Sequence, residues 1–92
     1  MTLKVKIHLL PINVNQIMSN NTLEISKLDT KCQRLIVYIR KKMGKTINED
    51  TPIFLYYNRF ALYPDTTIQE IVDHSPGTTE FDINFSFEVQ YG

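Results

Sequence analysis

The alternation of residue types near the end of the chain constrains the fold more than any other feature of the sequence. Every second residue from Phe81 to Tyr91 is apolar, and the residues between them are polar. A period of two is that of a β-strand with one buried face. We therefore predict a strand over residues 81–91 that packs one side against a core.

The N-terminal segment repeats this pattern. Apolar residues alternate with Lys4, Lys6 and His8 over residues 3–12, which predicts a half-buried strand that ends near Pro11. Residues 13–21 are polar and rich in asparagine, as is typical of a loop. Residues 22–27 alternate again, so we expect a hairpin.

A helical stripe follows this hairpin. Its apolar residues are spaced at i, i+3, i+4, i+7 and i+11, namely Cys32, Leu35, Ile36, Ile39 and Met43. Asp29 or Thr30 is the expected N-cap, and Gly44 is expected to end the helix in the left-handed conformation.

The remainder of the chain predicts two short strands, a second helix and the last strand. Residues 53–57 and 60–63 are rich in aromatics and are separated by the dipeptide Asn58-Arg59, which predicts a tight turn. Thr67 with Glu70 three residues later forms a capping box for a short helix. Ser75-Pro76-Gly77 then ends this helix.

This order of elements predicts a single α+β domain over residues 1–92. One long helix can cover one face of a mixed sheet of four to five strands, with the second, short helix beside it. The order is that of the ubiquitin-like β-grasp roll. In this fold the first and last strands lie parallel to each other in the middle of the sheet.

Bulk composition narrows the class of function. The chain has ten basic and ten acidic residues and no formal net charge, which argues against binding nucleic acid or anionic membranes by bulk electrostatics. Its single cysteine, Cys32, permits no internal disulfide. The first residues lack a secretory pattern. We expect a soluble cytoplasmic protein.

The sequence offers no catalytic, metal or cofactor motif. His8 and His74 are far apart in the sequence, lack metal-ligand spacing and are expected at the surface. Cys32 lies on the apolar stripe and is expected to behave as a buried hydrophobe. Because no nucleophile–base pair is visible, we expect a protein that is not an enzyme, with no metal and no cofactor.

Two surfaces are candidates for partner binding. The polar side of the long helix carries a basic stripe that is either a solvated face or a docking site for an acidic partner, with Arg34 and Lys41 as its main residues. The aromatic hairpin either buries its own rings or exposes a protein-binding patch. The candidate contacts on this hairpin are Phe54, Tyr56, Tyr57, Phe60 and Leu62.

The last two residues form a third candidate site. Gly92 has no Cβ, so a short tail of Tyr91 and Gly92 could enter a narrow channel of an adenylating enzyme. The alternative is that the chain simply stops there.

Three segments resemble one known family, the ubiquitin-like modifier called autophagy-related protein twelve. Residues 33–41 are similar to that family's helix, Gln-Gly-Leu-Ile-x-Phe-Ile-Lys-Lys. Residues 54–58, followed by Phe60-Ala61 and Pro64-Asp65, look like its third strand and turn. Tyr91-Gly92 stands where the family ends in an aromatic residue and a glycine. The turn after Asn58 is one residue shorter, and Leu62 replaces the family's proline.

The resemblance implies a conjugation pathway. Gly92 would be activated by a ubiquitin-activating-type enzyme, passed to a conjugating-type enzyme and joined by an isopeptide bond to a lysine of autophagy-related protein five. Tyr91 would set the approach of the tail. The conjugate would recruit the conjugating enzyme of the lipidation step and promote lipidation of a second modifier at the pre-autophagosomal membrane. The alternatives are a non-covalent ubiquitin-like docking module and the lipid-conjugated sister modifier.

Overall fold

The computed structural model describes residues 4–12, 21–44 and 47–88. Most of the predicted loop at 13–21 lies outside these residues. The elements follow the predicted order. They are β1 (Val5–Pro11), β2 (Thr22–Ile25), α1 (Gln33–Lys42), β3 (Phe54–Tyr57), β4 (Phe60–Leu62), α2 (Ile68–His74) and β5 (Glu80–Ser86).

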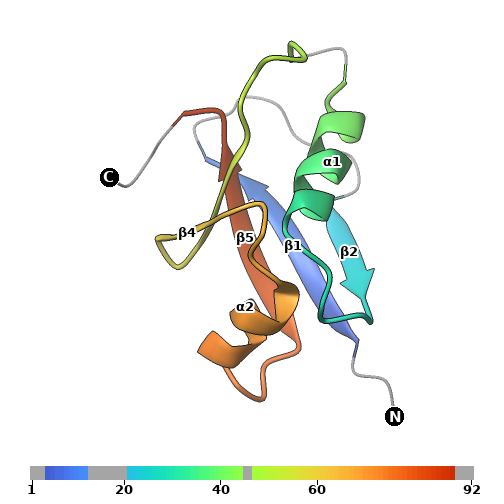
Figure 1. The fold of residues 1–92 in the computed structure, drawn as a ribbon, viewed down its shortest axis with the longest axis vertical. Helices are drawn as coiled ribbons and strands as arrows, with labels where there is room; N and C mark the ends of the chain where they lie inside the picture. Colours follow the sequence, from blue (N-terminus) through green and yellow to red (C-terminus); the bar gives the residue numbers. More distant parts are fainter. Residues whose placement is uncertain (1–3, 13–20, 45–46, 89–92) are drawn as a thin grey trace.

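The five strands form one sheet in the order β2-β1-β5-β3-β4 (Figure 1). The first and last strands lie side by side and parallel, with Ile7 opposite Phe81 and Leu9 opposite Ile83. The other strand pairs, β1 with β2, β3 with β4 and β3 with β5, are antiparallel. This is the arrangement expected for a β-grasp roll, and the prediction of fold class is confirmed.

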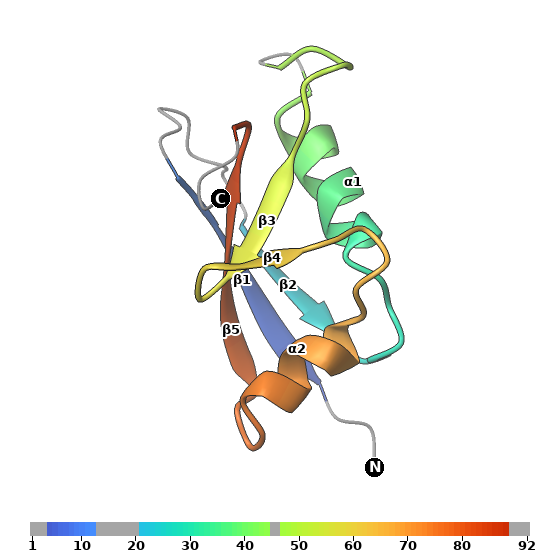
Figure 2. The same ribbon diagram turned by 60° about the vertical axis from the view of Figure 1, so that its left-hand side comes forward.

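The core lies between the sheet and the two helices, which cover the same side of it (Figure 2). The two central strands contribute six inward side chains that are at most 1% exposed, namely Val5, Ile7, Leu9, Phe81, Ile83 and Phe85. Helix α1 contributes the predicted stripe, with Leu35 and Ile39 fully buried. Each such side chain contributes about 1.5–3 kcal/mol to stability through burial.

The β3–β4 hairpin turns as its sequence predicts. Tyr57 pairs with Phe60, so Asn58 and Arg59 alone form the loop. Both have positive φ, 50° and 74°, as a two-residue primed turn requires. Asn tolerates this conformation well, whereas Arg carries a Cβ that disfavours it.

The start of α1 differs from the prediction. The helix begins at Gln33 with Cys32 in the N-cap position, and no side chain caps it. The backbone N–H groups of Cys32 and Gln33 instead donate to the carbonyl oxygens of Thr66 and Pro64, at 2.7 and 3.0 Å. A carbonyl from a distant segment satisfies the same donors as a capping side chain, so neither Asp29 nor Thr30 is needed in that role.

The ends of α1 and of the last strand also differ from the prediction. Helix α1 ends at Lys42, with Met43 as its C-cap at φ of −100°, and Gly44 is not in the left-handed region. The last strand ends at Ser86, since residues 87 and 88 form a bend. The predicted residues 89–91 of this strand lie outside the described part of the chain.

Candidate functional site

The predicted tail follows the central strand of the sheet. Ser86, the last residue of β5, is 1% exposed, and its hydroxyl donates to the carbonyl oxygen of Glu88. Phe87 packs against the core, with its ring centroid 6.2 Å from that of Phe85. The chain is therefore anchored by side-chain packing as far as Phe87. Tyr91 and Gly92 lie outside the described residues, so their roles remain predictions.

The aromatic hairpin is mostly buried. Tyr56, Tyr57 and Leu62 are 3%, 8% and 9% exposed, so these positions fit the alternative in which the hairpin is buried and not the exposed partner-binding patch. Tyr57 faces the core, where its ring meets Phe81 edge-on at 5.7 Å and its hydroxyl lies 2.7 Å from the hydroxyl of Ser75.

Two of the five hairpin candidates keep accessible surface. Phe54 is half-buried, and Phe60 is 59% exposed at the start of the edge strand β4. The Phe60 ring stacks on the ring of His74 at the end of α2, with centroids 5.5 Å apart and planes 15° apart. Among the five candidates, Phe60 is thus the residue most available to a partner.

The basic side of α1 is exposed as predicted. Arg34 and Lys41 both lie at the surface, two turns apart on one face. Their neighbour Arg40 is committed elsewhere, because its guanidinium donates to the carbonyl oxygens of Glu49 and Thr51 at 3.1 and 3.0 Å. Among the described residues, the side chains of Arg34 and Lys41 make no hydrogen bond or ion pair.

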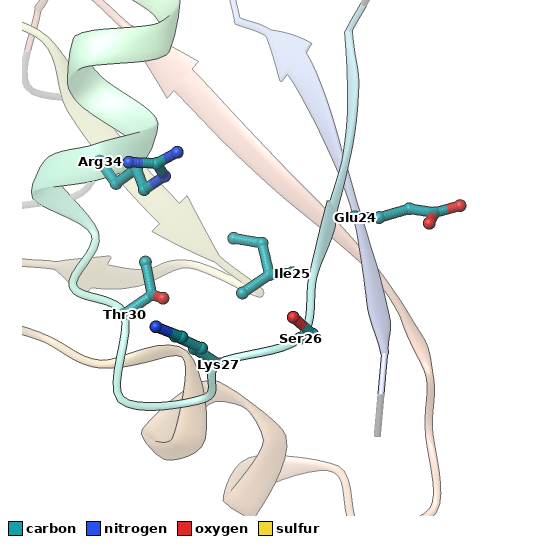
Figure 3. A pocket seen from close by; sticks show the side chains of 6 residues that line it. All are labelled: Glu24, Ile25, Ser26, Lys27, Thr30 and Arg34. Carbon is teal, nitrogen blue, oxygen red and sulfur yellow. The ribbon is translucent and has the colours of Figure 1, made fainter. Parts of the chain in front are cut away.

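A pocket of about 370 Å³ lies beside Arg34, between the end of β2 and the start of α1. Figure 3 shows five of its six lining side chains around this space, while Glu24 points away. These five are Ile25, Ser26, Lys27, Thr30 and Arg34. The pocket combines two cations, two hydroxyls and an apolar floor. The sequence singled out Arg34 but missed the others, because only the fold brings β2 against α1.

His8 lies on the outer face of the sheet, where its side chain on β1 contacts both neighbouring strands. Its Nδ1 is 3.0 Å from the Thr22 hydroxyl on β2, and its Nε2 is 3.0 Å from a carboxylate oxygen of Glu80 on β5. A carboxylate can only accept, so Nε2 donates to Glu80. His8 lies at the surface as expected, but its central strand places the ring between two neighbouring strands and half-buries it.

Cys32 is fully buried beneath the junction of the two helices. Burial, assisted by the negative charge of Glu70, raises the pKa of the Cys32 thiol to about 11. Because the thiolate is the nucleophile, this cysteine is unreactive near neutral pH. Among the described residues no three His, Cys, Asp or Glu side chains are grouped to hold a metal ion.

The described helices are also too short or too polar to cross a membrane.

Comparison of the fold with solved structures finds ATG8 of Trypanosoma brucei, with a TM-score of 0.74 and 13% sequence identity. The match covers 98% of this chain and 78% of that one, and at this identity it shows the fold alone.

No curated protein sequence matches the chain closely enough to be significant. A family model does: that of the ubiquitin-like autophagy protein Apg12, which matches residues 4–92. This match spans the sheet, both helices and the tail, and agrees with the three segments of resemblance in the sequence. The chain belongs to the Apg12 family of ubiquitin-like autophagy proteins.

Proposed function

We propose that this protein is a covalent modifier of autophagy that is activated and conjugated through Gly92. The observation that carries the proposal is the family match, which continues through the tail to residue 92. The fold supports it, because β5 is a central strand anchored as far as Phe87, which gives the following residues a fixed point of departure.

The reaction sequence needs only a carboxylate from this chain. The Gly92 carboxylate attacks the α-phosphorus of ATP and releases pyrophosphate. The thiolate of an activating enzyme then displaces AMP and forms a thioester, which passes to the thiolate of a conjugating enzyme. A lysine amine of autophagy-related protein five attacks the thioester carbonyl, forms the isopeptide bond and releases the thiol.

The catalytic groups belong to the enzymes in this scheme. This chain supplies the carboxylate, a tail in which Tyr91 sets the approach, and a rigid body that the enzymes bind. The conjugate then promotes lipidation of a second ubiquitin-like modifier by recruiting that step's conjugating enzyme. The protein would act in the cytoplasm and reach the pre-autophagosomal membrane through its partners.

The test is activation in vitro. Incubation with an autophagy activating enzyme and ATP should give an adduct on a non-reducing gel that disappears on addition of thiol. Deletion of Gly92 should abolish the adduct, while Val37→Ala, a substitution of an exposed helix residue, should leave it unchanged. An adduct that survives the deletion would show that the covalent model is wrong and would favour the non-covalent docking module.

The pocket beside Arg34 supports an acidic partner for the basic side of α1. Two cations and two hydroxyls around an apolar floor suit a segment that presents carboxylates next to an apolar side chain. Charge reversal of both Arg34 and Lys41 should weaken binding of the lipidation-step conjugating enzyme at least ten-fold by surface plasmon resonance, since two favourable contacts become repulsive. Unchanged affinity would remove the basic side from the docking model.

A further inference from the structure

The formal neutrality of the chain conceals a separation of charge. All ten Lys and Arg residues lie within residues 4–59, whereas six of the ten acidic residues lie within residues 60–92. The two helices show the same division, because α1 contains four basic residues and no acid, and α2 contains two acids and no Lys or Arg. The zero net charge therefore hides two helices of opposite charge.

The exposed side of α2 is the acidic one of the two helical surfaces. Its outward residues are Gln69, Glu70, Asp73 and His74, which adjoin one another on the helix. Glu70 is occupied by the capping box with Thr67. One carboxylate oxygen of Asp73 accepts from the Gln69 amide at 2.8 Å, and in the described part of the chain the other oxygen has no hydrogen-bond partner.

An aromatic platform lies at the C-terminal end of the same helix. The ring of Phe60, 59% exposed, lies almost parallel to the ring of His74, the residue that follows Asp73. A guanidinium group is planar, stacks on aromatic rings and pairs with carboxylates. A stacked pair of rings on a helix whose preceding residue carries a partly free carboxylate fits an arginine side chain better than a neutral or acidic one.

We propose that Phe60, Asp73 and His74, here called the α2 surface, dock a basic segment of a partner protein, with an arginine over the rings and paired with Asp73. Charge complementarity selects this occupant. Asp65, at the other end of α2, lies 3.9 Å from Lys31 and therefore adds little net negative charge. Arg59, next to Phe60 in the hairpin turn, is the one nearby cation along β3 and β4 and opposes the binding.

This docking site rests on the proposed function as a modifier and deepens it. It assigns partners of opposite charge to the two helices. The basic side of α1 would receive acidic segments, and the α2 surface would receive basic ones. Two partners could then bind one modifier without competing for the same residues.

The experiment is a titration of the full chain, labelled with ¹⁵N, with the peptide acetyl-Gly-Arg-Arg-Gly-amide, followed by NMR. We expect the largest shifts at the backbone amides of Phe60, Asp73 and His74. The same peptide with citrulline in place of arginine keeps the shape but loses the charge. It should bind roughly three- to ten-fold more weakly, as expected for an exposed cation–π contact and ion pair.

Two exposed substitutions test the residues directly. Phe60→Ala and Asp73→Asn should each reduce the shifts, and neither removes a buried side chain. The matched controls, Val37→Ala and Asp50→Asn, change an exposed apolar residue and an exposed acid elsewhere and should have no effect.

Three results would overturn the proposal: equal affinity for the citrulline peptide, shifts centred away from the α2 surface, or peptide binding unaffected by Asp73→Asn. A second copy of the chain is the competing occupant. Self-association by analytical ultracentrifugation that is lost in Lys41→Glu, together with no peptide binding, would assign the α2 surface to it. The titration uses no activating enzyme, so its failure is distinct from a failure of the Gly92 thioester test.

Discussion

The two helices of this protein begin in different ways. Helix α2 carries its own signal, since the Thr67 hydroxyl accepts from the Glu70 N–H and the Glu70 carboxylate accepts from the Thr67 N–H. Helix α1 has no such side chain, and its first donors bind the carbonyl oxygens of Pro64 and Thr66. One start can therefore be read from four consecutive residues, and the other depends on a segment some thirty residues away in the sequence.

The dependence is mutual. The N–H groups of Ile68 and Gln69 in α2 donate to the carbonyl oxygens of Thr30 and Leu28, at 2.9 and 2.8 Å. The segments before the two helices thus supply acceptors to each other, although only α2 also has a local cap. A missing capping signal therefore does not mean a weak helix start, because tertiary hydrogen bonds can replace the cap.

The largest effect should come from the core beneath α1. Leu35 is fully buried, so Leu35→Ala should lower the free energy of unfolding by about 2–5 kcal/mol in urea denaturation. Val37→Ala, at an exposed position of the same helix, should cost less than 1 kcal/mol. Equal costs for the two would show that α1 is held by local propensity and not by packing.

The next effect concerns Cys32 in the N-cap position of α1. Its pKa in the folded protein is about 11, compared with 9.0 for an ordinary thiol, so folding favours the protonated form. Stability should be complete below pH 9 and fall as the pH rises from 9 to 11, by at most about 2–3 kcal/mol.

Chemical denaturation across this pH range measures the loss. Cys32→Ala is the control, because it cannot titrate and should show a flatter profile above pH 9. Glu70→Gln should reduce the loss of stability above pH 9 only slightly. Burial is the main cause of the raised pKa of Cys32, and the charge of Glu70 is the smaller one. Identical profiles for wild type and Cys32→Ala would contradict the prediction.

The local cap of α2 should contribute less. Thr67→Ala removes the hydroxyl that accepts from Glu70 and should cost about 0.5–2 kcal/mol. Thr67→Ser keeps the hydroxyl and should change stability by only a few tenths of a kcal/mol. Thermal unfolding of both variants checks the difference. A neutral Thr67→Ala would mean that the bonds from Thr30 and Leu28 hold α2 alone.

The smallest effect is expected for the ion pair between the two helix starts. Lys31 and Asp65 are 3.9 Å apart, with side chains 61% and 95% exposed. Solvent screening then leaves the pair no more than about a few tenths of a kcal/mol, so Lys31→Ala should be almost neutral, and the small loss should shrink further with added salt. A double-mutant cycle with Asp65→Ala measures the coupling, and a value above 1 kcal/mol would be inconsistent with this view.

Local patterns predicted much of this fold. The period-two strands, the apolar stripe of α1, the Asn58-Arg59 turn and the Thr67–Glu70 box all rest on neighbouring residues, and the structure contains each of them. The candidate site was less predictable. Tyr56 and Tyr57 are neighbours in β3 and point to opposite faces of the sheet. The alternation of residue types could not predict that both would be buried.

The sequence alone determined the order of the elements, the parity that faces the core and the resemblance that pointed to the family, because these depend on the spacing of side chains along the chain. Only the tertiary structure decided where α1 begins, how His8 contacts both neighbouring strands, which partners line the pocket at Arg34 and why Phe60 stands beside His74. Each of these joins residues that are distant in sequence, and such contacts form only when the core is buried and the segments are brought together.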